Sequence, residues 1–230
     1  GHYTVTITQK QEGSDSIVTK QDLTVEKLED GKTAEVKAPQ LTEDDKYVAQ
    51  VGDDKYTSVK AAIEAAQDGQ TVELLKSAPI ETRNSIVIDG NGNTITRSTD
   101  GLILNVVYQD GTKVTVQNLT MSGNNGGGLL QWTMDAGYKD TTDPAVMPEF
   151  TVRGCTFTHN AAEKKGAGIG LWGLQNEGDA ASEVTITGCT FDTLSVGIYY
   201  NEEAPLVNLK STVTNNTFKN LSWTGLAGIP

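Results

Sequence analysis

Residues 184–191 read VTITGCTF, and the pattern of a short alternating segment, a bend residue and a Thr-aromatic pair recurs along the second half of the chain. Its other copies are residues 116–121 (VQNLTM), 152–157 (VRGCTF) and 213–218 (VTNNTF). Apolar residues at every second position are typical of a half-buried strand, and Gly or Asn tolerates the positive φ of a tight bend. Each copy therefore predicts two short strands joined by a turn.

A second motif, Gly followed by Leu or Ile and a short apolar run, alternates with the first. Its copies begin at Gly101, Gly128, Gly168, Gly197 and Gly225. Self-similarity at periods of a few tens of residues indicates stacked coils, because one such coil cannot bury its own apolar face. We therefore expect an all-β chain built around a parallel β-helix of about five coils.

Alignment of the copies predicts three columns of equivalent side chains. The first inward column is Ile95, Met121, Phe157, Phe191 and Phe218, and the second is Leu102, Leu129, Ile169, Ile198 and Leu226; the threonine column is Thr94, Thr120, Thr156, Thr190 and Thr217. The two cysteines, Cys155 and Cys189, share one slot in neighbouring coils. Stacked strands lie at disulfide distance, so this slot holds either a bridge or two small buried thiols.

A short helix is predicted just before the coils. Residues 57–67 (TSVKAAIEAAQ) place apolar residues on one stripe, with Thr57 or Ser58 as the N-cap. A strand at 71–75 and a turn-rich segment at 89–93 follow. This run resembles the opening of the pectin-lyase-like right-handed β-helix family. The resemblance covers residues 47–230 and implies a right-handed helix whose N-terminal end is capped by the short α-helix; that fold hosts many functions, so it implies no single activity.

Residues 1–46 follow a different pattern. The first two residues look like a tag scar, and segments 3–9, 23–27 and 33–38 alternate as strands do. We expect a small antiparallel β module here, and the parallel β-helix over 47–230. The module resembles the small β domains of Gram-positive surface proteins, which implies a bacterial cell-surface location.

The bulk charge excludes some partners. A net charge of −12 and a pI near 4.6 argue against nucleic acid, and no apolar run is long enough for membrane insertion. The composition fits a secreted or cell-wall-attached extracellular protein. A bare last coil would expose a sheet edge, so we expect further chain or a partner to cover the C-terminal end.

Alternation predicts an outward aromatic face on the second motif. Its residues are Asn105, Trp132, Trp172 and Asn201, with Tyr199 and Glu202 beside them. Exposed aromatic rings on a rigid sheet suit stacking on sugars or anchoring a protein partner. The alternative is that the inserted loops, residues 133–149 and 173–183, fold over these rings and bury them.

Carboxylates in the insertions offer a second chemistry. Asp135, Asp140 and Asp143 lie in one loop. A suitably spaced carboxylate pair hydrolyses glycosides, and clustered carboxylates bind Ca²⁺; the alternative is a solvated acidic surface. The chain departs from pectate lyases of this fold in having few arginines. The sequence thus predicts a module that binds a glycan or host glycoprotein, as an adhesin does, with no assigned catalytic or metal residue. A glycoside hydrolase or polysaccharide lyase is the alternative.

Overall fold

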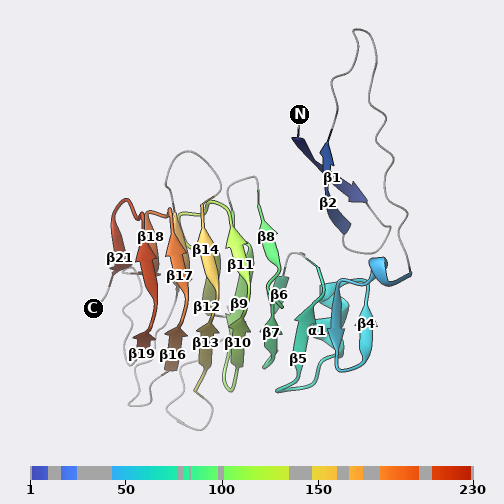
Figure 1. Ribbon diagram of the computed structural model, residues 1–230. Helices are drawn as coiled ribbons and strands as arrows, with labels where there is room; N and C mark the ends of the chain where they lie inside the picture. Colours follow the sequence, from blue (N-terminus) through green and yellow to red (C-terminus); the bar gives the residue numbers. More distant parts are fainter. Residues whose placement is uncertain are drawn as a thin grey trace.

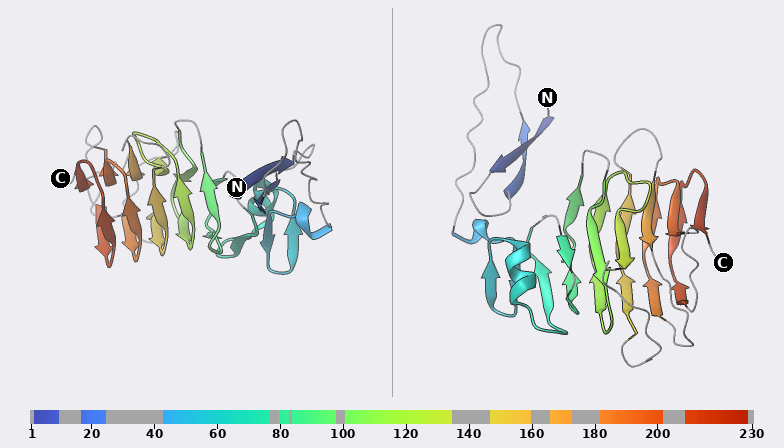
Figure 2. Two further views of the ribbon diagram at one scale, coloured as in Figure 1. Left: turned by 45° about the horizontal axis from the view of Figure 1, so that its top comes forward. Right: turned by 180° about the vertical axis from the view of Figure 1, so that it is seen from behind.

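The computed structural model describes residues 2–9, 17–24, 43–76, 80–82, 84–97, 101–134, 147–159, 166–172, 182–201 and 209–228. The chain is a parallel β-helix with five complete coils in the described part, and each coil passes through three sheets in turn. Figures 1 and 2 show the coils stacked along one axis, with the helix at one end and β21 at the other. The predicted fold class is therefore confirmed.

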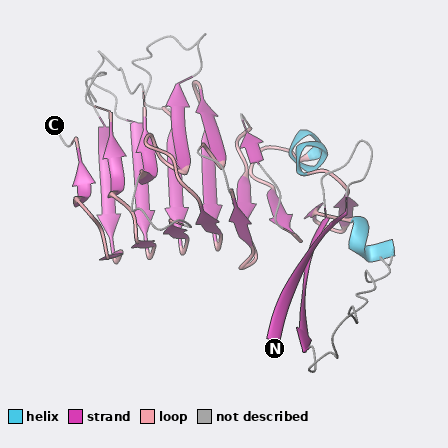
Figure 3. Cartoon of the chain, turned by 90° about the horizontal axis from the view of Figure 1, so that it is seen from above, coloured by secondary structure: helices cyan, strands magenta, loops and turns pink. Residues whose placement is uncertain are grey.

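The three sheets run along the stack and contain the following strands in spatial order. Sheet 1 consists of β4 (Asp54–Tyr56), β3 (Ala49–Val51), β5 (Thr71–Leu74), β7 (Val87–Asp89), β10 (Lys113–Gln117), β13 (Glu149–Arg153), β16 (Ser182–Thr187) and β19 (Leu209–Thr214). Sheet 2 consists of β8 (Thr94–Thr96), β11 (Thr120–Ser122), β14 (Thr156–Thr158), β17 (Thr190–Asp192) and β20 (Thr217–Lys219). Sheet 3 consists of β6 (Ile80–Thr82), β9 (Leu104–Tyr108), β12 (Leu130–Met134), β15 (Ala167–Leu171), β18 (Val196–Tyr200) and β21 (Thr224–Ala227). Figure 3 shows equivalent strands of successive coils side by side.

The turns between sheets 1 and 2 are built as the first motif predicts. Its bend residue has a positive φ in all four copies: Asn118 (53°), Gly154 (61°), Gly188 (64°) and Asn215 (56°). The threonine column and the first inward column are both in parallel register from coil to coil. Both predictions for sheet 2 are confirmed.

The inward aromatic column forms a stack of parallel rings. The Phe157 and Phe191 ring centroids lie 5.0 Å apart and those of Phe191 and Phe218 lie 4.9 Å apart, both with 8° between planes. The glycines of sheet 3 make room for these rings. A Cβ on Gly168 would lie 2.7 Å from the Phe191 ring, and one on Gly197 would lie 2.5 Å from the Phe218 ring. Glycine in sheet 3 is therefore the complement of phenylalanine in sheet 2.

The second inward column differs from the prediction in its first two coils. In sheet 3, Ile169, Ile198 and Leu226 are in register as expected, but their partners are Leu130 and Leu104. Leu129 is therefore level with Gly168, whereas the alignment predicts it level with Ile169. The predicted Leu102 lies two residues from the correct register.

The first coil is closed by a short cap. Helix α1 (Val59–Ala65) begins at Ser58, whose hydroxyl accepts a hydrogen bond from the Ala61 N–H, and it buries Val59, Ala62 and Ile63. Strands β3 and β4 add to sheet 1 antiparallel beside β5, and η1 (Glu43–Lys46) precedes them. The predicted helix and its capping position are confirmed.

The N-terminal segment forms a hairpin. β1 (His2–Gln9) pairs antiparallel with β2 (Ile17–Thr24) along its whole length. Of the strand predicted at 23–27, Leu23 and Thr24 belong to β2, which begins earlier, at Ile17, and residues 25–27 lie outside the described residues. The predicted strand at 33–38 lies outside the described residues. The boundary near residue 46 stays a prediction.

Cys155 and Cys189 are free thiols, both buried at the turns between sheets 1 and 2. Of the two alternatives for this slot, the structure has the buried thiols. Among the described residues, the helices are too short to cross a membrane.

Candidate functional site

An aromatic pair lies on the outer face of sheet 3. Tyr199 comes from β18 and Trp172 directly follows β15; both are half-buried. Their ring centroids are 5.8 Å apart with 65° between planes, an edge-to-face arrangement. The inward neighbours Leu171 and Ile198 are fully buried, so alternation directs these two rings away from the core. The pair combines apolar area with fixed geometry.

A turn from the preceding coil fixes the tryptophan. Trp172 Nε1 donates a hydrogen bond of 3.0 Å to the carbonyl oxygen of Gly127. A Cβ on Gly127 would lie 2.8 Å from the indole, and a Cβ on Gly170 would lie 1.8 Å from the Gly127 oxygen. Any side chain at Gly170 would therefore push the turn off the sheet and remove the acceptor of Trp172.

Polar side chains share the outer face with the pair. Asn105, Gln131, Gly170 and Tyr199 occupy one register row across β9, β12, β15 and β18. Thr133, two residues after Gln131 on β12, donates a hydrogen bond of 3.0 Å to Asn105 Oδ1. Asparagine and glutamine amides both donate and accept, as recognition of hydroxyl-rich ligands requires.

The predicted face is otherwise incomplete. Asn105, Trp172 and Tyr199 lie on the outside of sheet 3. Asn201 directly follows the end of β18 at Tyr200 and is buried, with 8% of its surface exposed. Glu202 lies outside the described residues, as do Asp135, Asp140 and Asp143.

The prediction that Trp132 faces outward is wrong. Trp132 is fully buried, and its ring lies 4.5 Å from that of Tyr108 and 5.4 Å from that of Phe150. It is in register with Leu171, not Trp172. The register of β12 differs by one residue from the predicted alignment, and a change of one residue moves Trp132 to the opposite face of the sheet. Trp132 is a core residue.

The described acids of the insertions lie elsewhere. Glu149 and Glu183 are in register on the outside of sheet 1, where each pairs with a lysine: Glu149 with Lys113 and Glu183 with Lys210, both at 2.6 Å. They are on a different sheet from Trp172. Among the described residues, no group of three or more His, Cys, Asp or Glu could hold a metal ion. The geometry brings no acid next to the aromatic pair in the described part of the chain.

Two carboxylates in the described part of the chain have lowered pKa values, and both lie away from sheet 3. Burial tends to raise the pKa of Asp89, but hydrogen bonds from the Asn91 N–H and from Gln117 and Asn118, together with the charge of Arg153, outweigh it and lower that pKa. The pKa of Asp192 is lowered chiefly by the hydrogen bond from Asn220. In both cases side chains of the neighbouring coil donate hydrogen bonds to the ionised carboxylate, and these bonds lower its pKa.

One exposed aromatic was not singled out from the sequence. Trp223, just before β21, is 70% exposed. Its backbone N–H donates a hydrogen bond to the Ser195 carbonyl oxygen, and the next residue, Thr224, is in register with Val196, so Trp223 occupies the corner position that Ser195 holds in the coil before. A tryptophan where the preceding repeat has serine is the sequence signal that identifies it.

No family model, curated protein or solved structure matches this chain. The class of protein that the geometry defines is a parallel β-helix with an outward aromatic pair on sheet 3.

Proposed function

We propose that this protein is a carbohydrate-binding module that holds a glycan, free or on a glycoprotein, on the outer face of sheet 3. The observation that carries the proposal is the partly exposed, edge-to-face Trp172–Tyr199 pair, in which Trp172 is fixed by its hydrogen bond to the Gly127 oxygen. A sugar ring presents apolar C–H faces that stack on aromatic rings, and its hydroxyls bond to amides such as those of Asn105 and Gln131. Preformed geometry lowers the entropic cost of binding.

The net charge of −12 narrows the ligand class. A strongly acidic protein repels polyanionic sugars at long range, so neutral glycans are the ligands that this face suits. The same acidity supports an extracellular, cell-wall-attached or secreted protein, and we propose an adhesin-like role there. The capping helix before the first coil supports membership of the pectin-lyase-like family.

The test is a glycan array with the wild type and Trp172→Ala. Loss of a central aromatic anchor costs about 2 kcal/mol or more, so affinity should fall about 30-fold or more. Trp223→Ala is the matched control, since it removes an equally large exposed ring at another place in the fold. Thermal melting of both variants checks that the fold is retained. Trp132→Ala is unsuitable here because that ring lies in the core.

The outcomes separate the candidate functions. Binding that is lost in Trp172→Ala and kept in Trp223→Ala supports the proposal. Equal affinity in all three proteins refutes the assigned face. Cleaved glycan in the product analysis would instead identify a carbohydrate-active enzyme, and the acids Asp135, Asp140 and Asp143 would then be the first to replace.

A further inference from the structure

Thr133 and Asn105 have fixed hydrogen-bonding roles on the outer face of sheet 3. The Thr133 hydroxyl donates a hydrogen bond of 3.0 Å to Asn105 Oδ1. Because a hydroxyl has one hydrogen, Thr133 can then only accept a hydrogen bond from a ligand. In Asn105 the oxygen is the accepting atom, so the Nδ2 group is the donor that this side chain offers. The two side chains therefore present an acceptor and a donor next to each other.

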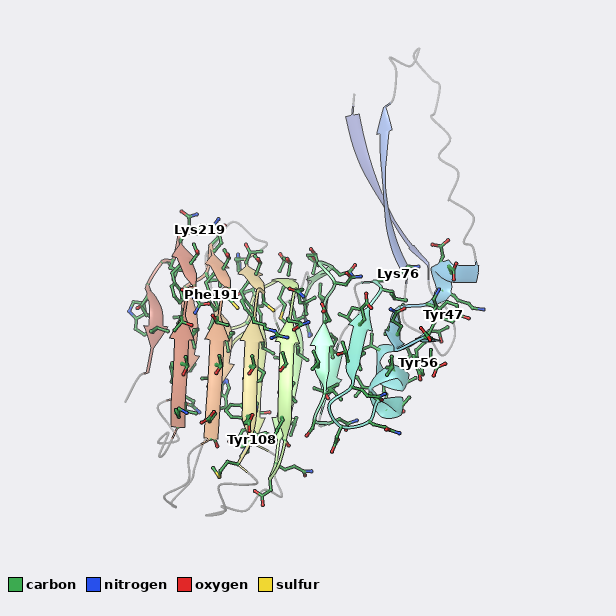
Figure 4. All side chains as sticks on the ribbon, turned by 60° about the horizontal axis from the view of Figure 1, so that its bottom comes forward. Tyr47, Tyr56, Lys76, Tyr108, Phe191 and Lys219 are labelled. Atoms are coloured by element: carbon green, nitrogen blue, oxygen red, sulfur yellow. The ribbon has the colours of Figure 1, made fainter. Side chains whose placement is uncertain are left out.

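Both side chains of this polar pair are partly exposed. Each is next in sequence to a residue with no exposed surface: Asn105 precedes Val106, and Thr133 follows Trp132. Figure 4 labels Tyr108, the buried residue that ends the strand of Asn105. Successive residues of a strand face opposite sides of the sheet, so Asn105 and Thr133 lie on the outside, where they can contact a ligand.

The tryptophan of the aromatic pair lies beside this polar pair. Trp132 is in register with Leu171. The next residues, Thr133 and Trp172, are therefore level on neighbouring chain segments, at the strand spacing of about 4.8 Å. The indole N–H of Trp172 is already bound to the Gly127 oxygen. Trp172 therefore offers a ligand its apolar ring, and the polar pair offers the hydrogen bonds.

We propose that this face binds a neutral glycan that contains an N-acetylhexosamine, with the sugar ring on Trp172 and the acetamido group on Thr133 and Asn105. Resting on the proposed glycan-binding role of sheet 3, this assignment adds the class of sugar. A secondary amide has its donor and its acceptor on different atoms, so its N–H donates to Thr133 Oγ1 while its oxygen accepts from Asn105 Nδ2. The acetamido group carries no charge, which suits a protein with a net charge of −12.

A sugar hydroxyl matches the polar pair less well than an acetamido group does. It carries its donor and its acceptor on one oxygen, so it can bond to Thr133 and Asn105 together only from a position between them. A glycan without acetamido groups therefore forms one hydrogen bond where the N-acetylated glycan forms two. The affinities of the two kinds of glycan should differ by about tenfold, the contribution of one hydrogen bond.

Two matched ligands test this assignment by titration calorimetry. Chito- and cello-oligosaccharides of equal length have the same backbone and linkage, and they differ in carrying an acetamido group or a hydroxyl on the second ring carbon. The wild type should bind the chito-oligosaccharide about tenfold more tightly. Thr133→Val removes the acceptor at nearly constant shape, so it should abolish this preference and leave the affinity for the cello-oligosaccharide unchanged. Thr133→Ser retains the hydroxyl and should retain the preference.

The matched control is Thr151→Val, the same change at a partly exposed threonine on the outer face of sheet 1, which should keep the preference. Equal affinity of the wild type for both glycans, or a preference that persists in Thr133→Val, overturns the assignment and leaves the glycan-binding face of sheet 3 standing. Binding of neither oligosaccharide also overturns the assignment. Loss of both affinities in Trp172→Ala is the separate result on which the proposed function depends.

Discussion

The stacked phenylalanines predict that Gly168 and Phe191 are energetically coupled. A Cβ on Gly168 would lie 2.7 Å from Phe191 Cδ1 and 2.9 Å from the Gly197 carbonyl oxygen, both closer than van der Waals contact. Gly168 has no positive φ, so alanine brings overpacking without backbone strain. Gly168→Ala should therefore lower the free energy of unfolding by about 1–3 kcal/mol.

Phe191→Leu removes two ring stackings, at about 0.5–1.5 kcal/mol each. It also removes the ring that the methyl group introduced by Gly168→Ala would meet, while the contact of that methyl group with the Gly197 oxygen persists. The double variant should therefore be more stable than the sum of the single effects predicts, by about 0.5–2 kcal/mol, within the range measured for touching residues.

Urea unfolding of the wild type, the two single variants and the double variant gives this coupling energy. The control is Gly126→Ala, because a Cβ on Gly126 meets nothing within 4 Å, and its effect should stay within about 0.5 kcal/mol. Additivity of the two changes to within about 0.5 kcal/mol would refute the steric complementarity of sheets 2 and 3.

Three further predictions concern buried groups and one surface carboxylate. Trp132→Ala should cost about 3–5 kcal/mol, which lowers the melting temperature by roughly 6–20 °C, and an unchanged melting curve would contradict its place between Tyr108 and Phe150. Since the pKa of Asp89 is lowered in the folded protein, its stabilisation is complete above the ordinary pKa of about 3.9 and is lost as the pH falls through the folded pKa. Asp89→Asn should therefore flatten the urea-stability profile below about pH 5, and an unaltered acid limb would refute this. Hydrogen bonding to Cys189 and burial raise the pKa of the Cys155 thiol, so Ellman's reagent at about pH 8 should modify Cys155 only after unfolding in denaturant; rapid modification of the folded protein would contradict it.

The sheet 2 side of each coil was predictable because its motif contains its own register marker. A bend residue, one spacer, a threonine and an apolar residue follow one another at fixed spacing in every copy. The bend has a positive φ in every copy, which Gly and Asn tolerate best, and this preference anchors the alignment. The Thr94 to Thr217 column and the stack that ends at Phe218 follow directly from that anchor.

The sheet 3 side was not predictable to the same accuracy because its glycines have two different roles. Gly168 lies in a strand and faces the Phe191 ring, whereas Gly128 has φ 117° and lies in a turn against Gly170. The two look identical in the sequence, each followed by a branched apolar residue. Aligning Gly128 with Gly168 displaces β12 by one residue from its observed register. A one-residue shift exchanges the two faces of a strand, and this is why the sequence pattern predicts Trp132 on the outside.

Glycine therefore positions the aromatic rings on both sides of sheet 3. Inside, Gly168 and Gly197 leave the space that the rings of Phe191 and Phe218 fill. Outside, Gly170 lets the turn at Gly127 lie on the sheet, and that turn binds Trp172. In both places a glycine of one coil contacts a group of a neighbouring coil, a phenylalanine ring inside and the Gly127 turn outside. The arrangement therefore depends on the register between coils. A sequence pattern within one coil defines the strands, but the candidate site is defined only by how neighbouring coils meet.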